Sequence, residues 1–143
     1  MSRSNEWKED PKHLGFVLSR YKFVSKMLRG FDDVLEIGAG DGWASEIVRK
    51  EVKNLTLTDL VPSEGVVPFD IMKSHFSSIF SGVYSIDVIE HVNSSERFLK
   101  NINESMKSSG VCIIGTPSIE SQVYASRLSK EHHINCMNAE RLR

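Results

Sequence analysis

Apolar residues recur along the chain in two alternating patterns, and these patterns predict the secondary structure. From residue 12 to residue 29 the spacing is that of one helix face, and Gly30 stands where a C-capping glycine belongs. The apolar positions of this helix are Leu14, Val17, Leu18, Tyr21, Val24, Met27 and Leu28. Short apolar runs predict five strands, at residues 33–37, 55–58, 65–69, 82–86 and 111–115. Pro68 cannot donate a hydrogen bond, so the third strand should be weak or lie at an edge.

Helical patterns lie between these strands. Residues 44–52 show one apolar face, residues 71–80 form a short helix at most, and residues 93–109 form a clear helix. Asn93 is the expected N-cap of that last helix, and Gly110 is expected to end it. Strands that alternate with helices predict an α/β fold of the Rossmann-like type, with a mostly parallel sheet and helices on both faces.

Composition limits the partners of the protein without naming a function. The chain has 143 residues, and we expect a single domain made of an N-terminal arm and helix (1–30), a core (31–117) and a substrate-side or truncated region (118–143). A net charge of −1 gives no sign of a nucleic-acid partner, and no apolar run approaches the ~20 residues that span a bilayer. The two cysteines form no disulfide framework and the N-terminus is polar, which together favour a cytoplasmic location.

A glycine-rich turn after the first predicted strand is the strongest chemical signal in the sequence. It reads Glu36-Ile37-Gly38-Ala39-Gly40-Asp41-Gly42 and leads into a predicted helix, whose free N–H groups suit a carboxylate or a phosphate. A dinucleotide fingerprint needs a third glycine where this chain has Trp43, so the spacing disfavours NAD. Asp59, at the end of the second strand, can accept hydrogen bonds from two ribose hydroxyls. Its alternative role is to cap the turn before Pro62.

Five segments in order resemble the successive motifs of class I S-adenosylmethionine-dependent methyltransferases. They are VLEIGAGDGWA, LTLTD, FDI, YSIDVIEHV and GVCIIGTPS. The match runs from Tyr21 to Ser118 and is closest to the small-molecule enzymes whose fourth strand leads into Ile-Glu-His. The resemblance implies S-adenosyl-L-methionine as cofactor, a small-molecule methyl acceptor and strand order 3-2-1-4-5. Complete members have two more strands, for which this sequence shows no pattern.

The same resemblance implies roles for the residues that match its motifs. Gly38, Ala39 and Gly40 would line the methionine part of the cofactor, and Glu36 would help to set their loop. These three loop residues, with the helix behind them, are the part of the site that the spacing of the sequence also supports.

Four further residues would surround the adenosine part of the cofactor. By resemblance, Asp59 would hold the ribose, Leu60 would lie against the adenine, Asp70 would contact the adenine amino group and Ile71 would flank the ring. From the residues alone, Asp70 is equally well placed to cap a short helix that begins near Ile71.

The turn after the fourth strand would face the reacting atoms. By resemblance, Ser85 and Asp87 would close the site below the sulfonium. His91 would either act as general base for an oxygen or nitrogen nucleophile, or only orient the loop by a hydrogen bond while Glu90 stays solvated. His132 and His133 lack the spacing of a zinc site, so we expect no metal and place them on the surface or beside the substrate.

Two alternatives to methyl transfer stay open. The chain fits a non-catalytic module that binds S-adenosylmethionine or a partner, and it also fits another enzyme that consumes this cofactor on the same fold. The continuously apolar fifth strand should be buried on both faces. We expect its outer edge to be covered by residues 118–136 or by a second copy of the chain, giving a homo-oligomer.

Overall fold

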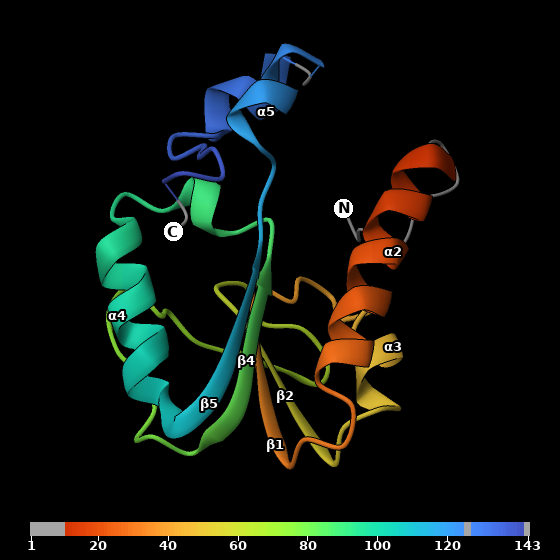
Figure 1. Cartoon of the computed structure of the whole chain (residues 1–143), viewed down its shortest axis with the longest axis vertical. Helices are drawn as coiled ribbons and strands as arrows, with labels where there is room; N and C mark the ends of the chain where they lie inside the picture. Colours follow the sequence, from red (N-terminus) through yellow and green to blue (C-terminus); the bar gives the residue numbers. More distant parts are fainter. Residues whose placement is uncertain (1–10, 125–126, 142–143) are drawn as a thin grey trace.

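A single parallel sheet forms the centre of the protein in a computed structural model that describes residues 11–124 and 127–141 (Figure 1). Its strands lie in the order β3-β2-β1-β4-β5, and every neighbouring pair is parallel. Their bounds are β1 Asp33–Ile37, β2 Asn54–Asp59, β3 Val66–Pro68, β4 Phe80–Ile86 and β5 Met106–Gly115. The predicted α/β class, strand number and strand order are therefore confirmed, and the strand that contains Pro68 does lie at an edge.

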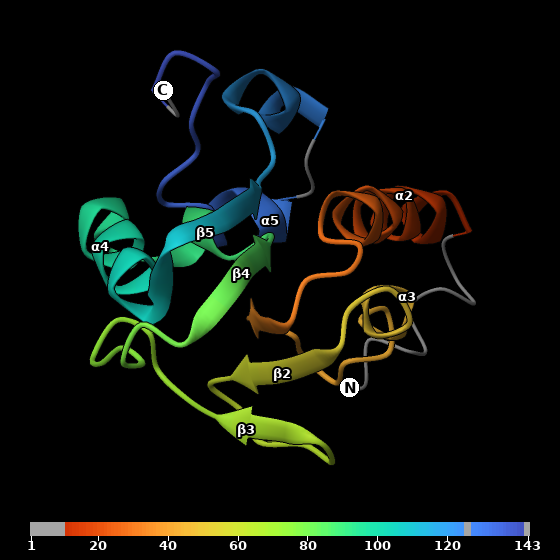
Figure 2. The ribbon, with the colours of Figure 1, turned by 60° about the horizontal axis from the view of Figure 1, so that its bottom comes forward.

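Helices cover both faces of this sheet. Helix α2 (Pro11–Met27) and the short α3 (Glu46–Arg49) lie on one face, and α4 (Ser95–Ser105) lies on the other (Figure 2). The remaining short helices follow the carboxyl ends of the last two strands: η2 (Ile89–His91), η3 (Ile119–Tyr124) and α5 (Arg127–His132). Among the described residues, no helix has the length and hydrophobicity that a membrane span requires.

Two apolar clusters fill the space between the sheet and its helices. On the α4 side, Phe98 and Ile102 pack against sheet residues such as Leu35 and Val83. On the α2 side, Val24 and Leu28 pack against Val34, Val48 and Tyr84, among others. These residues are buried, as the apolar spacing of the helices predicts.

The helix expected at 93–109 is shorter than its sequence pattern suggests. Its N-cap is Ser94, not Asn93, since the Ser94 hydroxyl accepts the N–H of Arg97 at 3.2 Å. It ends at Ser105, because Met106 already pairs with Phe80 as the first residue of β5. Gly110 therefore lies inside β5, within a register irregularity, and does not end a helix. The helix considered for 71–80 is also wrong, because residues 71–73 form only a turn.

The fifth strand differs from its expectation in burial. None of the β5 residues is fully buried, and Cys112 is exposed, so the prediction of two buried faces is wrong. Val111 and Ile113 pack toward the α2 side while Ile114 packs toward the α4 side, but the strand lies at the sheet edge and stays half open. In the described part of the chain, residues 118–136 do not pair with the outer edge of β5. An isolated bridge joins Ser118 to Met137 beyond the end of this strand.

A buried carboxylate joins these layers just below the glycine loop. Glu36 on β1 is fully buried and accepts hydrogen bonds from the hydroxyls of Tyr21 (2.6 Å), Ser45 (2.5 Å) and Tyr84 (2.5 Å). Burial, together with the charge of Glu36, raises the pKa of Tyr84, which therefore remains a donor. The three donors come from α2, from the turn before α3, and from β4. One buried carboxylate thus links the three segments that lie around the glycine loop.

Removing one of these donors should destabilise the fold. Because a buried charged acceptor then loses a hydrogen bond, Tyr84→Phe should reduce the free energy of unfolding by about 1.5–3 kcal/mol in urea denaturation. Tyr124→Phe serves as the matched control, since Tyr124 is 91% exposed, and it should leave the transition unchanged. An unchanged urea midpoint for Tyr84→Phe would show that the Glu36 cluster contributes no net stability.

Candidate functional site

The glycine loop between β1 and α3 has a backbone that other residues would not adopt. Gly38 has a φ of 78°, and a Cβ atom there would lie 2.2 Å from the side chain of Val88. Gly42 has a φ of 74°, and its Cβ would lie 2.7 Å from the side chain of Leu57. The loop is held by the carbonyl of Thr58, which accepts the N–H groups of Gly38 and Ala39. Glycine is thus required both for the turn and for close packing against two neighbouring segments.

Asp59 stands at the carboxyl end of β2 and contacts this loop directly. Its Oδ2 accepts the N–H of Gly40 at 2.8 Å, and its Oδ1 accepts the N–H of Val61 at 3.1 Å. Each carboxylate oxygen can accept a further hydrogen bond, so the side chain can hold the loop and still accept ligand hydroxyls. The next residue, Leu60, is 70% exposed and offers apolar surface beside it.

Asp70 and Ile71 both have structural roles, one in a turn and the other in the core. The Oδ1 of Asp70 accepts the N–H of Met72 at 2.9 Å, and its Oδ2 lies 3.4 Å from the Nζ of Lys73. Asp70 therefore caps the turn that follows β3, which is the alternative that the sequence left open. Ile71 is buried in the α4-side core cluster, so its side chain does not reach a cleft in this conformation.

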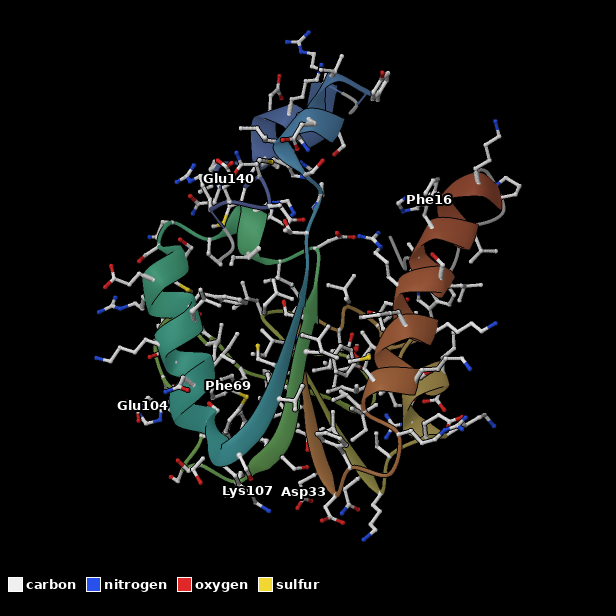
Figure 3. The ribbon with its side chains drawn as sticks, in the orientation of Figure 1. Phe16, Asp33, Phe69, Glu104, Lys107 and Glu140 are labelled. Atoms are coloured by element: carbon white, nitrogen blue, oxygen red, sulfur yellow. The ribbon has the colours of Figure 1, made fainter. Side chains whose placement is uncertain are left out.

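A cleft of about 780 Å³ lies between α2, the glycine loop and η2. Three of the expected site residues line it, namely Ala39, Asp87 and His91. The other lining residues are His13, Leu14, Phe16, Val17, Arg20, Tyr21, Trp43, Ala44, Ile86, Glu90, Pro117, His132 and His133. Figure 3 shows Phe16 on α2 and Glu140 in the C-terminal segment toward one end of the sheet, with Asp33 and Lys107 at the opposite end.

The expected site residues thus separate into groups. The carboxyl end of β2 brings Asp59 and Leu60 beside Gly40, while the cleft begins at Ala39 and extends toward η2. Two expected residues, Glu36 and Ser85, have fully buried side chains and do not line the cleft. Glu36 accepts the hydroxyls of the segments around the loop, and no hydrogen-bond partner is found for the buried Ser85 hydroxyl.

A half-buried ion pair forms one wall of the cleft. Arg20 Nη1 on α2 lies 2.5 Å from Asp87 Oδ1, which follows β4. Asp87 has a φ of 56°, a conformation that aspartate tolerates better than most residues, and its N–H donates to the carbonyl of Gly115. The ion pair links α2 to the carboxyl end of β4, next to Tyr21 and the glycine loop.

The C-terminal segment closes the other end of the cleft by hydrogen bonds to η2. The carbonyl of Glu90 accepts the N–H groups of Ile134 (2.8 Å) and Asn135 (3.0 Å). The Nδ1 of His91 lies 2.8 Å from the carbonyl of His132, and the Asn135 amide donates to the carbonyl of Val92. These contacts bring residues from the end of the chain to the Ile-Glu-His turn.

The structure overturns the interpretation of Glu90 as a solvated residue. Its side chain is fully buried, and its Oε2 accepts the Thr116 hydroxyl at 3.1 Å. Burial, and to a smaller extent the charge of Asp87, raises the pKa of Glu90. Sequence reasoning missed Trp43 as a cleft residue, and it placed Glu90 at the mouth of the crevice but missed its burial. The signal for Glu90 was its place beside His91 at the end of a central strand.

Two curated relatives are similar to this chain in sequence, and one solved structure is similar to it in fold. The chain is 25% identical to a ubiquinone biosynthesis O-methyltransferase from Rickettsia canadensis over 70% of this chain and 47% of the relative. It is 32% identical to a malonyl-[acyl-carrier protein] O-methyltransferase from Calditerrivibrio nitroreducens over 56% of this chain and 36% of the relative. A SAM-dependent methyltransferase from Archaeoglobus fulgidus shares the fold, with a TM-score of 0.72 and 22% identity over 90% of this chain and 64% of that chain.

The chain spans less than half of the length of the two curated relatives. A family model described as a methyltransferase domain matches residues 8–143, which include the glycine loop, Asp59 and the whole cleft. The chain therefore belongs to the methyltransferase domain family.

Proposed function

We propose that this chain binds S-adenosylmethionine and transfers its methyl group to a small-molecule acceptor. The observation that carries the proposal is the contact between the glycine loop and Asp59, with Gly40 N–H donating to Asp59 Oδ2 next to Ala39, which lines the cleft. Membership of the methyltransferase domain family supports the same reaction. Both curated relatives are O-methyltransferases by name, which supports an oxygen atom as the acceptor.

In this proposal the cofactor lies across the carboxyl ends of the strands. Asp59 accepts the ribose hydroxyls, Leu60 covers the adenine and Asp70 contacts the adenine amino group, whereas the buried Ile71 supports this end from the core. Gly38, Ala39 and Gly40 would line the methionine part, Asp87 would face the reactive end from the cleft wall, and the buried Ser85 would support it from below. A carboxylate that accepts loop N–H groups is rigidly oriented, which favours selective binding of a diol.

The remaining task of the protein is to align the acceptor with the reactive carbon. The sulfonium already carries a positive charge, so in-line geometry and exclusion of water dominate the rate. At the η2 end of the cleft, His91 Nδ1 lies 2.8 Å from the His132 carbonyl, which leaves Nε2 as the ring nitrogen that would act as general base. We expect the acceptor to enter between α2 and this histidine.

A finer part of the proposal concerns the partner and the cell compartment. The outer edge of β5 has no strand partner within residues 11–124 and 127–141, and such an edge favours pairing with a second copy of the chain. Cys112 and Cys136 are both free, which fits the reducing environment of a cytoplasmic location.

Cofactor selectivity is the direct test of the proposed function. Titration calorimetry should show one S-adenosylmethionine or S-adenosylhomocysteine bound per chain, with no heat from NAD, because the loop lacks the third fingerprint glycine. Transfer of a labelled methyl group to metabolite pools then separates an enzyme from a module that only binds. Binding of NAD in place of S-adenosylhomocysteine would refute the proposal.

Replacing Asp59 should weaken both the cofactor complex and the loop. Asp59→Ala removes an acceptor worth about 1.5–3 kcal/mol per charge-assisted bond, so affinity for S-adenosylhomocysteine should fall by at least tenfold. Stability should also fall by about 1 kcal/mol, since the N–H groups of Gly40 and Val61 lose their acceptor. Asp33→Ala, at the opposite end of the sheet, is the matched control and should keep full affinity (Figure 3). Equal affinity of wild type and Asp59→Ala would leave Asp59 as a turn residue only.

Introducing a charged side chain on β5 tests self-association through this strand. Sedimentation should show a dimer that Cys112→Lys weakens, because a charge at the strand edge opposes pairing of two sheets. Val67→Lys introduces the same charge on β3 at the other edge and should leave the dimer intact. A monomeric wild-type chain, or a dimer that Val67→Lys alone disrupts, contradicts association through β5.

A further inference from the structure

Three side chains of the metal-ligating type meet at the end of the cleft. Glu90 and His91 come from η2, and His133 comes from the segment that follows α5. Each offers one ligand atom, and these atoms all lie within 4.8 Å of one another. In the sequence His133 lies far from the other two, which is why no metal spacing was recognisable there.

The hydrogen bonds of the two histidines leave the same ring nitrogen free on each. His91 Nδ1 lies 2.8 Å from the carbonyl of His132, which can only accept, so Nδ1 carries the proton. His133 Nδ1 lies 2.9 Å from the Oε1 of Gln122, so the same argument assigns its proton. The Nε2 lone pair of each neutral ring is therefore available. Metal-binding histidines commonly donate their second N–H to a carbonyl in this way.

The two imidazole rings lie in contact at the end of the cleft. Their centroids are 5.0 Å apart and their planes cross at 61°, in an edge-to-face arrangement. Two rings from segments far apart in the sequence are thus held close enough to share a ligand.

The carboxylate of Glu90 has an oxygen that lacks a partner. The side chain is fully buried; Thr116 donates to Oε2, but no hydrogen-bond partner is found for Oε1. Oε1 lies 3.9 Å from the Nε2 of His91, which is too far for a hydrogen bond. A buried anionic oxygen without a partner is costly, and a cation between it and the imidazoles would remove that cost.

The geometry of the cluster is compatible with coordination after a small movement. Ligand atoms bound at ~2.0–2.2 Å to a tetrahedral ion lie about 3.4 Å apart, so no pair within 4.8 Å has to approach by more than about 1.4 Å. His91 is 44% exposed and His133 is half-buried, so both rings have room to move while Glu90 stays fixed. Three protein ligands leave at least one position open, and all three residues line the cleft.

We propose that Glu90 Oε1, His91 Nε2 and His133 Nε2 bind a divalent transition-metal ion of the zinc type at the η2 end of the cleft. The site depends on the cluster alone. Its relation to the reaction rests on the proposed function: an acceptor oxygen that enters the cleft would fill the open position. In this arrangement His91 holds the metal through the nitrogen that general-base catalysis would otherwise use.

Direct metal titration tests the proposal without any methyl transfer. Untagged protein is titrated with Co²⁺, whose visible absorption reports its ligands, and Zn²⁺ is then added as competitor. We expect one Co²⁺ per chain, displaced by Zn²⁺. His133→Ala and Glu90→Gln should each weaken binding by at least about tenfold. Circular dichroism melting of each variant confirms that it is folded.

Two matched controls locate the site. His132→Ala should keep Co²⁺ binding, since His132 contributes its backbone carbonyl and not its ring. His75→Ala removes an exposed histidine on the turn before β4 and should also have no effect. Wild-type protein that binds no Co²⁺, or binding that survives both His133→Ala and Glu90→Gln, overturns the proposal. So does binding that His132→Ala abolishes.

A separate measurement keeps this proposal distinct from the proposed function. S-adenosylhomocysteine binding is followed by calorimetry in the same samples with and without Zn²⁺. Cofactor binding without metal binding refutes the metal site and leaves the cofactor site standing. Metal binding without cofactor binding supports the metal site and refutes the proposed function.

Discussion

A fully buried carboxylate, Glu36, is the constraint on which the rest of the structure depends. A charge without water needs several donors, and this one obtains them from α2, from the turn before α3 and from β4. Those three segments surround the glycine loop. The loop backbone, with its positive φ values, is therefore held from below by hydrogen bonds and from the side by the packing of Val88 and Leu57.

The two ends of the candidate site differ in how their polar groups are held. At the β2 end, Asp59 is oriented by backbone N–H groups and is rigid, which suits recognition of a polar ligand group. At the η2 end, Glu90 is buried with one unpartnered oxygen beside two histidines, which stores an unfavourable free energy that a ligand can relieve. The Arg20–Asp87 ion pair lies on the cleft wall between the loop and this second end.

Residues 132–135 hold the Ile-Glu-His turn in place by hydrogen bonds. Without residues 132–135, His91 would have no carbonyl to fix its tautomer and Glu90 would lose two N–H donors to its backbone carbonyl. A segment that looks like an irregular tail in the sequence is thus part of the site. Sequence reasoning missed this because the segment's own apolar pattern is weak and its contacts are mainly to the backbone.

The sequence by itself determined the fold class, the glycine loop and the place of Asp59 at the end of a strand, because these depend on local periodicity and on residues that only certain backbones accept. The strand order followed from the resemblance of its motifs to a known family. Helix ends were less predictable: Met106 continues the helical pattern but pairs with Phe80, since sheet formation outweighs local propensity. Only the tertiary structure decided that Glu90 is buried, that Cys112 is exposed and that His133 meets His91. Burial and proximity are properties of packing between distant segments, and a linear pattern does not contain them.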